Sequence, residues 1–131
     1  MFNFEKLLVW QKAVLFNGMV YRMPRVFPVD ERFGLTSQLR RAAISIAANI
    51  VEGCARDSSR ELLQFLNIAF GSTREVGYHL SLAKRLGYLN GDDAALLESK
   101  YDETARVLLG LRKSLIRSDV TSKLKTQDSR L

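Results

Sequence analysis

The chain has 131 residues, of which 47% are hydrophobic and 26% are charged, a balance typical of a single globular domain. Its single cysteine, Cys54, excludes an internal disulfide framework and any metal site built from several cysteines. No apolar run approaches the roughly 18 residues that span a bilayer, and the N-terminus lacks the layout of a signal peptide, so we expect a cytoplasmic protein. The net charge of +6 favours an anionic partner such as nucleic acid. A solvated surface with a mild basic bias would give the same net charge.

The first predicted helix runs from about Phe4 to Met23, with Asn3 as its cap. Pro24 is expected to end it, because proline supplies no N–H group and biases the preceding residue away from helical angles. A connection rich in turn residues follows, over residues 24–34. The apolar side of this helix is expected to contain Phe4, Leu7, Leu8, Trp10, Val14, Leu15, Met19 and Tyr21.

The second predicted helix covers residues 35–53, and the rest of the chain is organised around it and the helix that follows. Its buried side is set by apolar residues that recur at three- and four-residue steps, which places them on one face of an α-helix. These residues are Leu39, Ala43, Ile46 and Ile50. Thr36 or Ser37 is expected to cap the start of the helix, and Gly53 to close it as a C-terminal glycine.

The third predicted helix begins with a capping box over Ser58-Ser59-Arg60-Glu61. In such a box the serine hydroxyl accepts from the glutamate N–H, and the glutamate carboxylate accepts from the serine N–H. The helix is expected to end near Gly87 and, because the break before it is short, to form an antiparallel hairpin with the second helix. Its apolar seam is Leu62, Leu66, Ala69, Thr73, Val76, Leu80 and Ala83.

A fourth helix is predicted to start with Asn90 or Asp92 as its cap and to reach about Arg117. Its seam is Leu97, Tyr101, Thr104, Leu108, Leu111 and Leu115. Four helices joined by short links predict an all-α fold, an antiparallel up-down-up-down four-helix bundle over residues 1–118. The polar, aperiodic residues 119–131 are predicted to form a flexible C-terminal tail.

Several motifs at fixed relative positions resemble those of one known family. In the first helix and the connection they are Val9-Trp10-Gln11-Lys12, Pro28 and Glu31-Arg32-Phe33-Gly34-Leu35. In the second and third helices they are Gln38-Leu39-Arg40-Arg41-Ala42, Ser45-Ile46, Asn49-Ile50, Glu52-Gly53, Phe65-Leu66, Ile68-Ala69, Gly71-Ser72 and Glu75. From about Phe4 to Leu115 the chain is therefore similar to the four-helix-bundle proteins of the 23S rRNA intervening-sequence family, also called S23 ribosomal proteins.

The resemblance implies a small, all-helical bacterial protein whose relatives are encoded in intervening sequences of rRNA genes or elsewhere in the genome. A related group, the accessory variability proteins of diversity-generating retroelements, forms pentameric barrels that bind nucleic acid and a reverse transcriptase. By similarity we expect a homo-oligomer, with a pentamer as the favoured assembly. A reverse transcriptase is an expected protein partner on the same ground, although no residue of the chain identifies a retroelement.

Ten basic residues are candidates for a nucleic-acid surface, which would hold phosphates without sequence preference. Arg40 and Arg41 are neighbours on one helix, about 100° apart, so they cannot both face one core. The alternative is that the basic residues form salt bridges to Glu52, Glu61 or Glu75, within a subunit or between subunits. The ten candidates are Lys12, Arg22, Arg25, Arg40, Arg41, Arg56, Arg60, Arg74, Lys84 and Arg85.

Asn49, Glu52, Ser72 and Glu75 form a second candidate set, on the adjacent second and third helices. Polar groups near an apolar seam need hydrogen-bonded or charged partners, so we interpret this set as a structural network or a subunit interface rather than a catalytic carboxylate pair. The one histidine, His79, cannot supply the two Glu-x-x-His motifs of a di-metal bundle site. We therefore expect no metal, no cofactor and no enzymatic activity.

Two functions remain open from the sequence. The first is a non-enzymatic oligomeric bundle that binds RNA or DNA through a basic surface. The second is a protein-interaction adaptor that docks on a nucleic-acid-processing enzyme such as a reverse transcriptase, with its charge serving complementarity to that partner. The two functions are compatible within one assembly.

Overall fold

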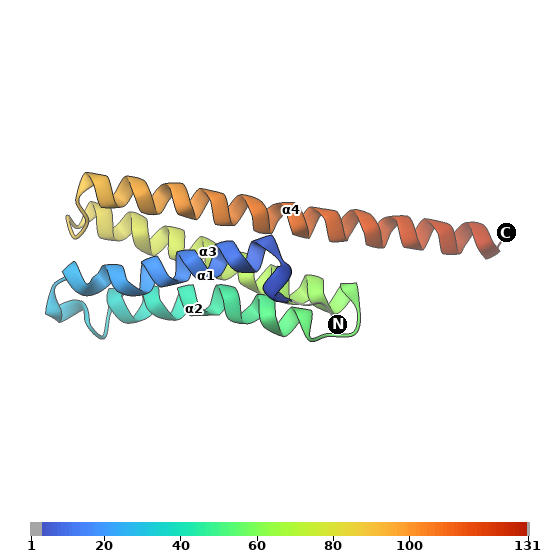
Figure 1. Cartoon of the computed structure of the whole chain (residues 1–131), viewed down its shortest axis with the longest axis horizontal. Helices are drawn as coiled ribbons and strands as arrows, with labels where there is room; N and C mark the ends of the chain where they lie inside the picture. Colours follow the sequence, from blue (N-terminus) through green and yellow to red (C-terminus); the bar gives the residue numbers. More distant parts are fainter. Residues whose placement is uncertain (1–3, 131) are drawn as a thin grey trace.

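The computed structural model describes the backbone of residues 4–130 and the side chains of residues 5–118. Over this part the chain forms helices and no strand, as Figure 1 shows, so the predicted all-α class is confirmed. The long helices are α1 (Leu8–Arg22), α2 (Leu35–Cys54), α3 (Ser59–Arg85) and α4 (Gly91–Arg130). Short 3-10 helices are η1 (Phe4–Lys6), η2 (Met23–Val26) and η3 (Val29–Glu31).

The four long helices form the predicted up-down-up-down bundle. Each helix packs against the next one along the chain, and α1 also packs against α4, which closes the ring of four contacts. The ends of α1 and α3 therefore lie at the same end of the bundle as the starts of α2 and α4, on the left in Figure 1. This end contains the α1–α2 link and most of the surface discussed below.

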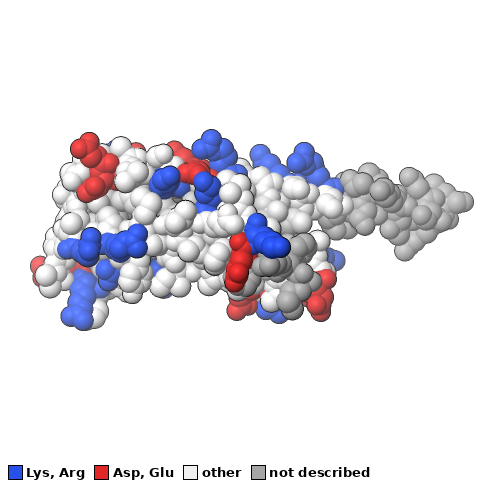
Figure 2. Space-filling model, in the orientation of Figure 1, with Lys and Arg blue, Asp and Glu red and all other residues white. Residues whose placement is uncertain are grey.

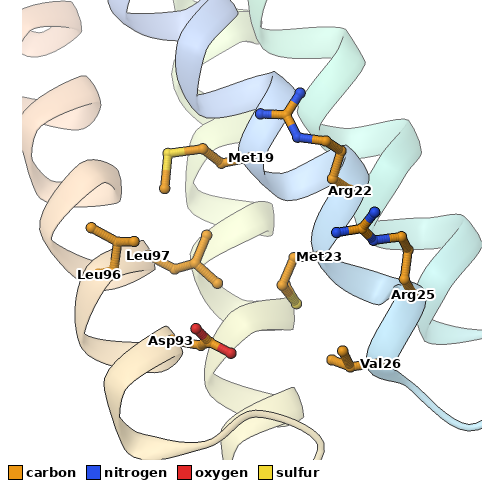
Figure 3. A pocket seen from close by; sticks show the side chains of 8 residues that line it. All are labelled: Met19, Arg22, Met23, Arg25, Val26, Asp93, Leu96 and Leu97. Carbon is orange, nitrogen blue, oxygen red and sulfur yellow. The ribbon is translucent and has the colours of Figure 1, made fainter.

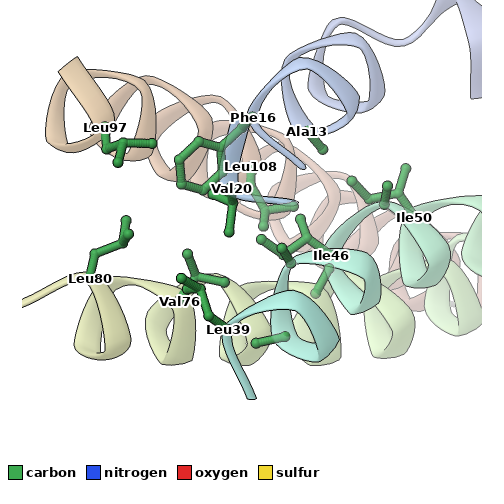
Figure 4. Packing of buried hydrophobic residues seen from close by; sticks show 14 of the residues in the cluster. Ala13, Phe16, Val20, Leu39, Ile46, Ile50, Val76, Leu80, Leu97 and Leu108 are labelled. Atoms are coloured by element: carbon green, nitrogen blue, oxygen red, sulfur yellow. The ribbon is translucent and has the colours of Figure 1, made fainter. Parts of the chain in front are cut away.

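The core is filled from all four helices, as the close-up in Figure 4 shows. Phe16 of α1, Ile46 of α2, Val76 of α3 and Leu108 of α4 are each at most 1% exposed. Removing a side chain of this size from water contributes about 1.5–3 kcal/mol. The predicted seam of α3 is confirmed residue by residue, and the four predicted core residues of α2 are also buried.

The predicted apolar side of the first helix is right only in part, since Leu7, Trp10 and Met19 pack half-buried against the core. Val9, Ala13, Phe16 and Val20 form the buried face of α1, whereas the predicted members Leu8, Val14, Leu15 and Tyr21 are exposed. The physical reason is that α1 carries large apolar residues on every side, so that more than one stripe satisfies a 3.6-residue period. The positions of α2 and α4 decide which stripe is covered.

The ends of the helices follow local chemistry at three of the predicted positions. The Ser58 hydroxyl accepts from the Glu61 N–H at 3.1 Å, and Asn90 Oδ1 accepts from the Asp93 N–H at 2.8 Å. Gly87 has a φ of 77°, and after it the Tyr88 N–H donates to the Ala83 carbonyl at 3.0 Å. A glycine in this left-handed conformation with that backbone bond is a Schellman motif, so α3 ends where glycine permits. α1 also ends before Pro24, as expected.

The predicted caps of the second helix are wrong. Gly34 is the N-cap residue and provides no side-chain cap, while Thr36 is buried inside the first turn. Gly53 lies within α2, and a Cβ atom placed there would come within 2.8 Å of Leu62 Cδ1 and 3.0 Å of Phe65 Cβ. Gly53 therefore allows α2 and α3 to approach closely, and it does not terminate the helix by adopting a positive φ.

The fourth helix is longer than expected. It continues to Arg130 instead of ending near Arg117, and Figure 1 shows it projecting beyond the other three helices. The sequence after Gly110 contains neither proline nor glycine to stop it. The predicted cap Asn3 lies outside the described residues, and the side chains of the predicted tail, 119–131, do as well, so both stay predictions.

Candidate nucleic-acid interface

The ten predicted basic residues fall into two groups in the structure. Those of the first group each have a carboxylate partner. The pairs are Lys12 with Glu103, Arg41 with Glu75, Arg56 with Glu52 at 3.2 Å and Lys84 with Glu98 at 3.2 Å. The predicted salt bridging therefore holds for Arg41 with Glu75 and for Arg56 with Glu52, within one subunit, whereas Lys12 and Lys84 pair with glutamates of α4 that were not predicted as partners.

The second group forms no ion pair within the part of the chain that the structure describes. Its members are Arg22, Arg25, Arg40, Arg60, Arg74 and Arg85. Arginine stays charged at any physiological pH, so each of them leaves a positive charge without a carboxylate partner. Figure 2 shows basic side chains gathered over the end of α1 and the α1–α2 link, at the left, whereas basic and acidic side chains are interspersed along α4.

Arg40 and Arg41 reach towards different helices, as their separation on α2 requires. Arg40 Nε donates to the backbone carbonyl of Tyr21 at 3.0 Å, and its guanidinium lies 4.7 Å from the centre of the Tyr21 ring. Arg41 Nε donates to Gln38 Oε1 at 3.1 Å, and the same guanidinium pairs with Glu75 on α3. Arg40 thus joins α2 to α1, and Arg41 joins α2 to α3.

A groove of about 500 Å³ lies on the surface where the end of α1 meets the start of α2. We call it the α1–α2 groove, and its lining residues are Tyr21, Arg32, Phe33, Thr36, Ser37, Arg40, Arg41 and Ile44. The lining contains three arginines and no carboxylate. Arg32 also stands 5.3 Å from the centre of the Phe33 ring, so two arginine–aromatic pairs occur in one groove.

Of the eight lining residues, only Arg40 and Arg41 were predicted to belong to a functional surface, and the two aromatic residues and Arg32 were missed. Arg32 and Phe33 were part of a family motif to which no role was given, and Tyr21 was expected on the buried side of its helix. A large aromatic next to arginine in a link that ends at a glycine was the available signal. The position of Tyr21 has no such signal, because it depends on how α1 is rotated in the bundle.

A second concavity, of about 260 Å³, lies at the same end of the molecule between α1 and α4. Figure 3 shows that its apolar lining comes from both helices and from η2. These residues are Met19, Met23, Val26, Leu96 and Leu97, with Arg22, Arg25 and Asp93 beside them. We call it the methionine cleft.

The second predicted set, Asn49, Glu52, Ser72 and Glu75, does not form one network. Ser45 joins two members, because its Oγ lies 2.8 Å from Ser72 Oγ and accepts from Asn49 Nδ2 at 2.9 Å. Glu75 is separate and contacts Arg41 and His79, and Glu52 pairs with Arg56. The Ser45–Ser72 and Arg41–Glu75 contacts link α2 to α3, whereas the Glu52–Arg56 pair stays at the end of α2.

No group of three or more histidine, cysteine or acidic side chains within the described residues is placed to hold a metal ion. Cys54 is buried, and burial raises the pKa of its thiol, so the nucleophilic thiolate is disfavoured at neutral pH. Among the described residues, no helix has the length and hydrophobicity needed to cross a membrane.

Comparison with known proteins identifies the relatives of this bundle. The model of the 23S rRNA-intervening sequence protein family matches residues 5–110. The chain belongs to this family. Its fold is also similar to the crystal structure of a protein of unknown function from the S23 ribosomal protein family of Bacteroides thetaiotaomicron, with a TM-score of 0.72 and 26% sequence identity over 81% of this chain and 99% of that chain. No match is found among curated proteins.

Membership of the family accounts for the bundle but leaves its activity open, since the similar protein from Bacteroides is itself of unknown function. The family match also ends at residue 110, so the projecting part of α4 lies outside it. The function is therefore inferred from the surface residues of this chain.

Proposed function

We propose that the protein is a non-enzymatic, oligomeric helical bundle that binds RNA or DNA through its basic surface. The observation that carries this proposal is the set of arginines without carboxylate partners among the described residues, from Arg22 at the end of α1 and Arg25 in η2 to Arg85 at the end of α3. The guanidinium group presents several donors in a fork that matches phosphate oxygens. Contacts to phosphates provide affinity without sequence preference.

Four of the six unpaired arginines, Arg22, Arg25, Arg40 and Arg85, lie at one end of the bundle, whereas Arg60 lies at the start of α3 and Arg74 within it. Arg22 and Arg25 both line the methionine cleft, and Arg32 and Arg40 both line the α1–α2 groove. Tyr21 in that groove directly precedes Arg22 along α1, so the two concavities flank the end of the same helix. Several positive charges spread over both sides of one helix end suit a polyanion better than they suit a small anion.

The proposal is tested by fluorescence anisotropy with labelled single- and double-stranded RNA and DNA across salt concentrations. The informative variant is Arg22→Ala/Arg25→Ala, which removes two unpaired charges. We expect weaker binding to all four probes, and a salt slope shallower by about two, one for each lost phosphate contact. Light scattering checks that the assembly is unchanged.

The matched control is Arg56→Ala at the other end of α2, because Arg56 already pairs with Glu52. We expect its affinity and salt slope to stay close to those of the wild type. Absence of salt-dependent binding by the wild-type protein to every probe would contradict the proposed function. A change at Arg40 or Arg41 is less informative, since both also hold α2 to its neighbours.

Self-association is part of the proposal, with the pentamer as the expected assembly. Several large apolar side chains remain exposed on one subunit, including Leu8 at 55% and Leu15 at 68% on α1 and Ile68 at 52% on α3. Covering such side chains is a common driving force for subunit association. Light scattering of the purified protein measures the mass directly, and a monomer at micromolar concentration would contradict this part.

The methionine cleft favours a second candidate function, a protein-interaction adaptor. Met19 and Met23 are flexible and polarizable, and such side chains adapt to different apolar partners. Val26 and Leu96 beside them are more than half exposed. A pull-down after nuclease treatment should then recover a nucleic-acid-processing enzyme, such as a reverse transcriptase, and Leu96→Asp should abolish the capture. Equal capture of the enzyme by the wild type and by Leu96→Asp would argue against the methionine cleft as the docking site.

A further inference from the structure

We propose that the α1–α2 groove is a binding site for single-stranded nucleic acid, in which bases stack on Phe33 and Tyr21 while the groove arginines hold phosphates. This inference rests on the proposed function and deepens it, since it names the class of nucleic acid and the place where its bases lie. A basic surface alone would hold duplex and single strand alike. The groove adds contacts that only an unpaired strand can use.

Two exposed aromatic rings are available for stacking. Phe33 is 85% exposed and Tyr21 is 48% exposed, although the bundle has a well-filled core to which neither ring is needed. Both rings line the same groove, together with the half-exposed Ile44. Aromatic side chains displayed in a positively charged groove are the usual platform for the bases of single strands, because every base has a face that can stack.

The side chains of the groove are already organised. Arg40 is held over the Tyr21 ring by its bond to the Tyr21 carbonyl, and Arg32 lies beside Phe33. Guanidinium planes themselves stack on bases as well as bind phosphates. Side chains that are held before binding lose less conformational entropy when a ligand arrives.

The charge of the groove indicates an anionic occupant. Arg32 and Arg40 form no ion pair within the described residues, and Arg41 shares its charge with one carboxylate, Glu75. Thr36 and Ser37 place the first turn of α2 in the lining, and the N-terminus of a helix adds a partial positive charge. A second copy of this chain would have to bury these charges, whereas a phosphate backbone neutralises them.

The exposed rings also distinguish single strands from duplexes. In a duplex the faces of the bases are covered by their neighbours, so a protein reaches only the base edges and the backbone. The rings of Phe33 and Tyr21 have no stacking partner in a duplex. The groove therefore predicts tighter binding of an unstructured strand than of a duplex of the same length.

The test uses the full chain and two labelled probes of equal length, an unstructured oligo(dT) strand and a mixed-sequence DNA duplex. Phe33→Ala removes the most exposed ring, and its exposure means that the fold does not depend on it. We expect affinity for the single strand to fall by about tenfold, the effect of losing one base–aromatic stack. Affinity for the duplex should stay within about twofold of the wild type, because phosphate contacts are retained.

Two further variants make the result specific. Phe33→Trp keeps a stacking surface and should restore binding of oligo(dT). Val29→Ala, at an equally exposed apolar position in the same link, should behave like the wild type for both probes. The stacking role of Phe33 would be overturned if Val29→Ala lost binding of the single strand. It would also be overturned if Phe33→Trp failed to bind the single strand.

Each remaining outcome decides between this inference and its alternatives. If Phe33→Ala binds oligo(dT) as the wild type does, the inference is overturned while the proposed nucleic-acid function stands. If light scattering shows a smaller mass for Phe33→Ala, the groove is a contact between copies of this chain and the inference is overturned whatever the affinity. If the wild type binds neither probe, nor any RNA, the proposed function itself fails.

Discussion

The α2–α3 seam and the α1–α4 seam join helices of the same bundle in different ways. Between α2 and α3 the helices meet at Gly53, where no room for a side chain remains, and a hydrogen bond connects Ser45 to Ser72. Between α1 and α4 the polar contact is the ion pair of Lys12 with Glu103, and two concavities of about 260 Å³ open along the seam.

The α2–α3 seam is suited to stabilising the bundle, whereas the α1–α4 seam is suited to contacting a partner. The α2–α3 seam combines small residues with a continuous buried stripe on α3, so substitutions there disturb close packing. The α1–α4 seam leaves apolar and basic groups accessible to a partner, and its ion pair is partly exposed. We therefore expect the free energy of unfolding to depend strongly on the first seam and weakly on the second.

The largest effect is expected from Leu66→Ala in the α3 stripe. Leu66 is fully buried, and a leucine-to-alanine change in a core lowers the free energy of unfolding by about 2–5 kcal/mol. Urea unfolding followed by circular dichroism measures the change. Gln64→Ala, at an exposed position two residues before Leu66 on the same helix, is the control and should change it by less than about 1 kcal/mol. Equal effects would mean that the stripe does not carry the stability.

The next largest effect is expected from Gly53→Ala. The added methyl group would meet Leu62 and the Phe65 Cβ atom at 3.0 Å or less, so α2 and α3 have to move apart. Overpacking of this kind lowers the free energy of unfolding by about 1–3 kcal/mol. Gly71→Ala is the matched control, because a methyl group added at Gly71 meets nothing within 4 Å, and alanine is favoured over glycine in a helix by about 1 kcal/mol. Stabilisation by both changes would show that the two helices are packed less tightly than the contacts of Gly53 indicate.

A smaller effect is expected from Ser72→Ala. This change removes the partner of the Ser45 hydroxyl on the facing helix but leaves that hydroxyl bonded to Asn49. The loss of one such hydrogen bond lowers the free energy of unfolding by about 1 kcal/mol. Ser81→Ala on the exposed side of α3 is the control, and chemical denaturation of both variants gives the comparison. No difference between them would mean that the hydrogen bond does not stabilise the seam.

The smallest effect is expected at the α1–α4 seam, and it depends on pH. The hydrogen bond from Lys12 is the main cause that lowers the pKa of Glu103, with the charge of Lys100 contributing. Because the folded pKa lies below the unfolded value, this contribution is present above the unfolded pKa and is lost as pH falls through the folded one. Lys12→Met should therefore lower the thermal midpoint slightly at neutral pH.

In strongly acidic solution, once Glu103 is protonated, that difference between Lys12→Met and the wild type should disappear. Thermal unfolding from neutral to acidic pH tests this, with Lys6→Met on the neighbouring exposed surface as the control. A difference that persisted in acid would assign the role of Lys12 to the packing of its aliphatic stem.

The sequence alone determined the features that depend on neighbours along the chain. The period of apolar residues predicted the buried stripe of α3 without error, because no competing stripe exists on that helix. Ser58, Gly87 and Asn90 marked helix ends correctly, since each acts on backbone groups within a few residues. These local signals were sufficient to predict a four-helix bundle.

Tertiary structure decided everything that depends on which helices face one another. Basic residues look alike in sequence, yet Arg41 meets a carboxylate and Arg22 meets none among the described residues, because only the packing of α3 on α2 brings Glu75 within reach. The α1–α2 groove combines Tyr21 with Phe33, from segments that meet only when α1 is rotated to bury Phe16 instead of Tyr21. Periodicity left that rotation open, and the contacts of α1 with α2 and α4 fixed it.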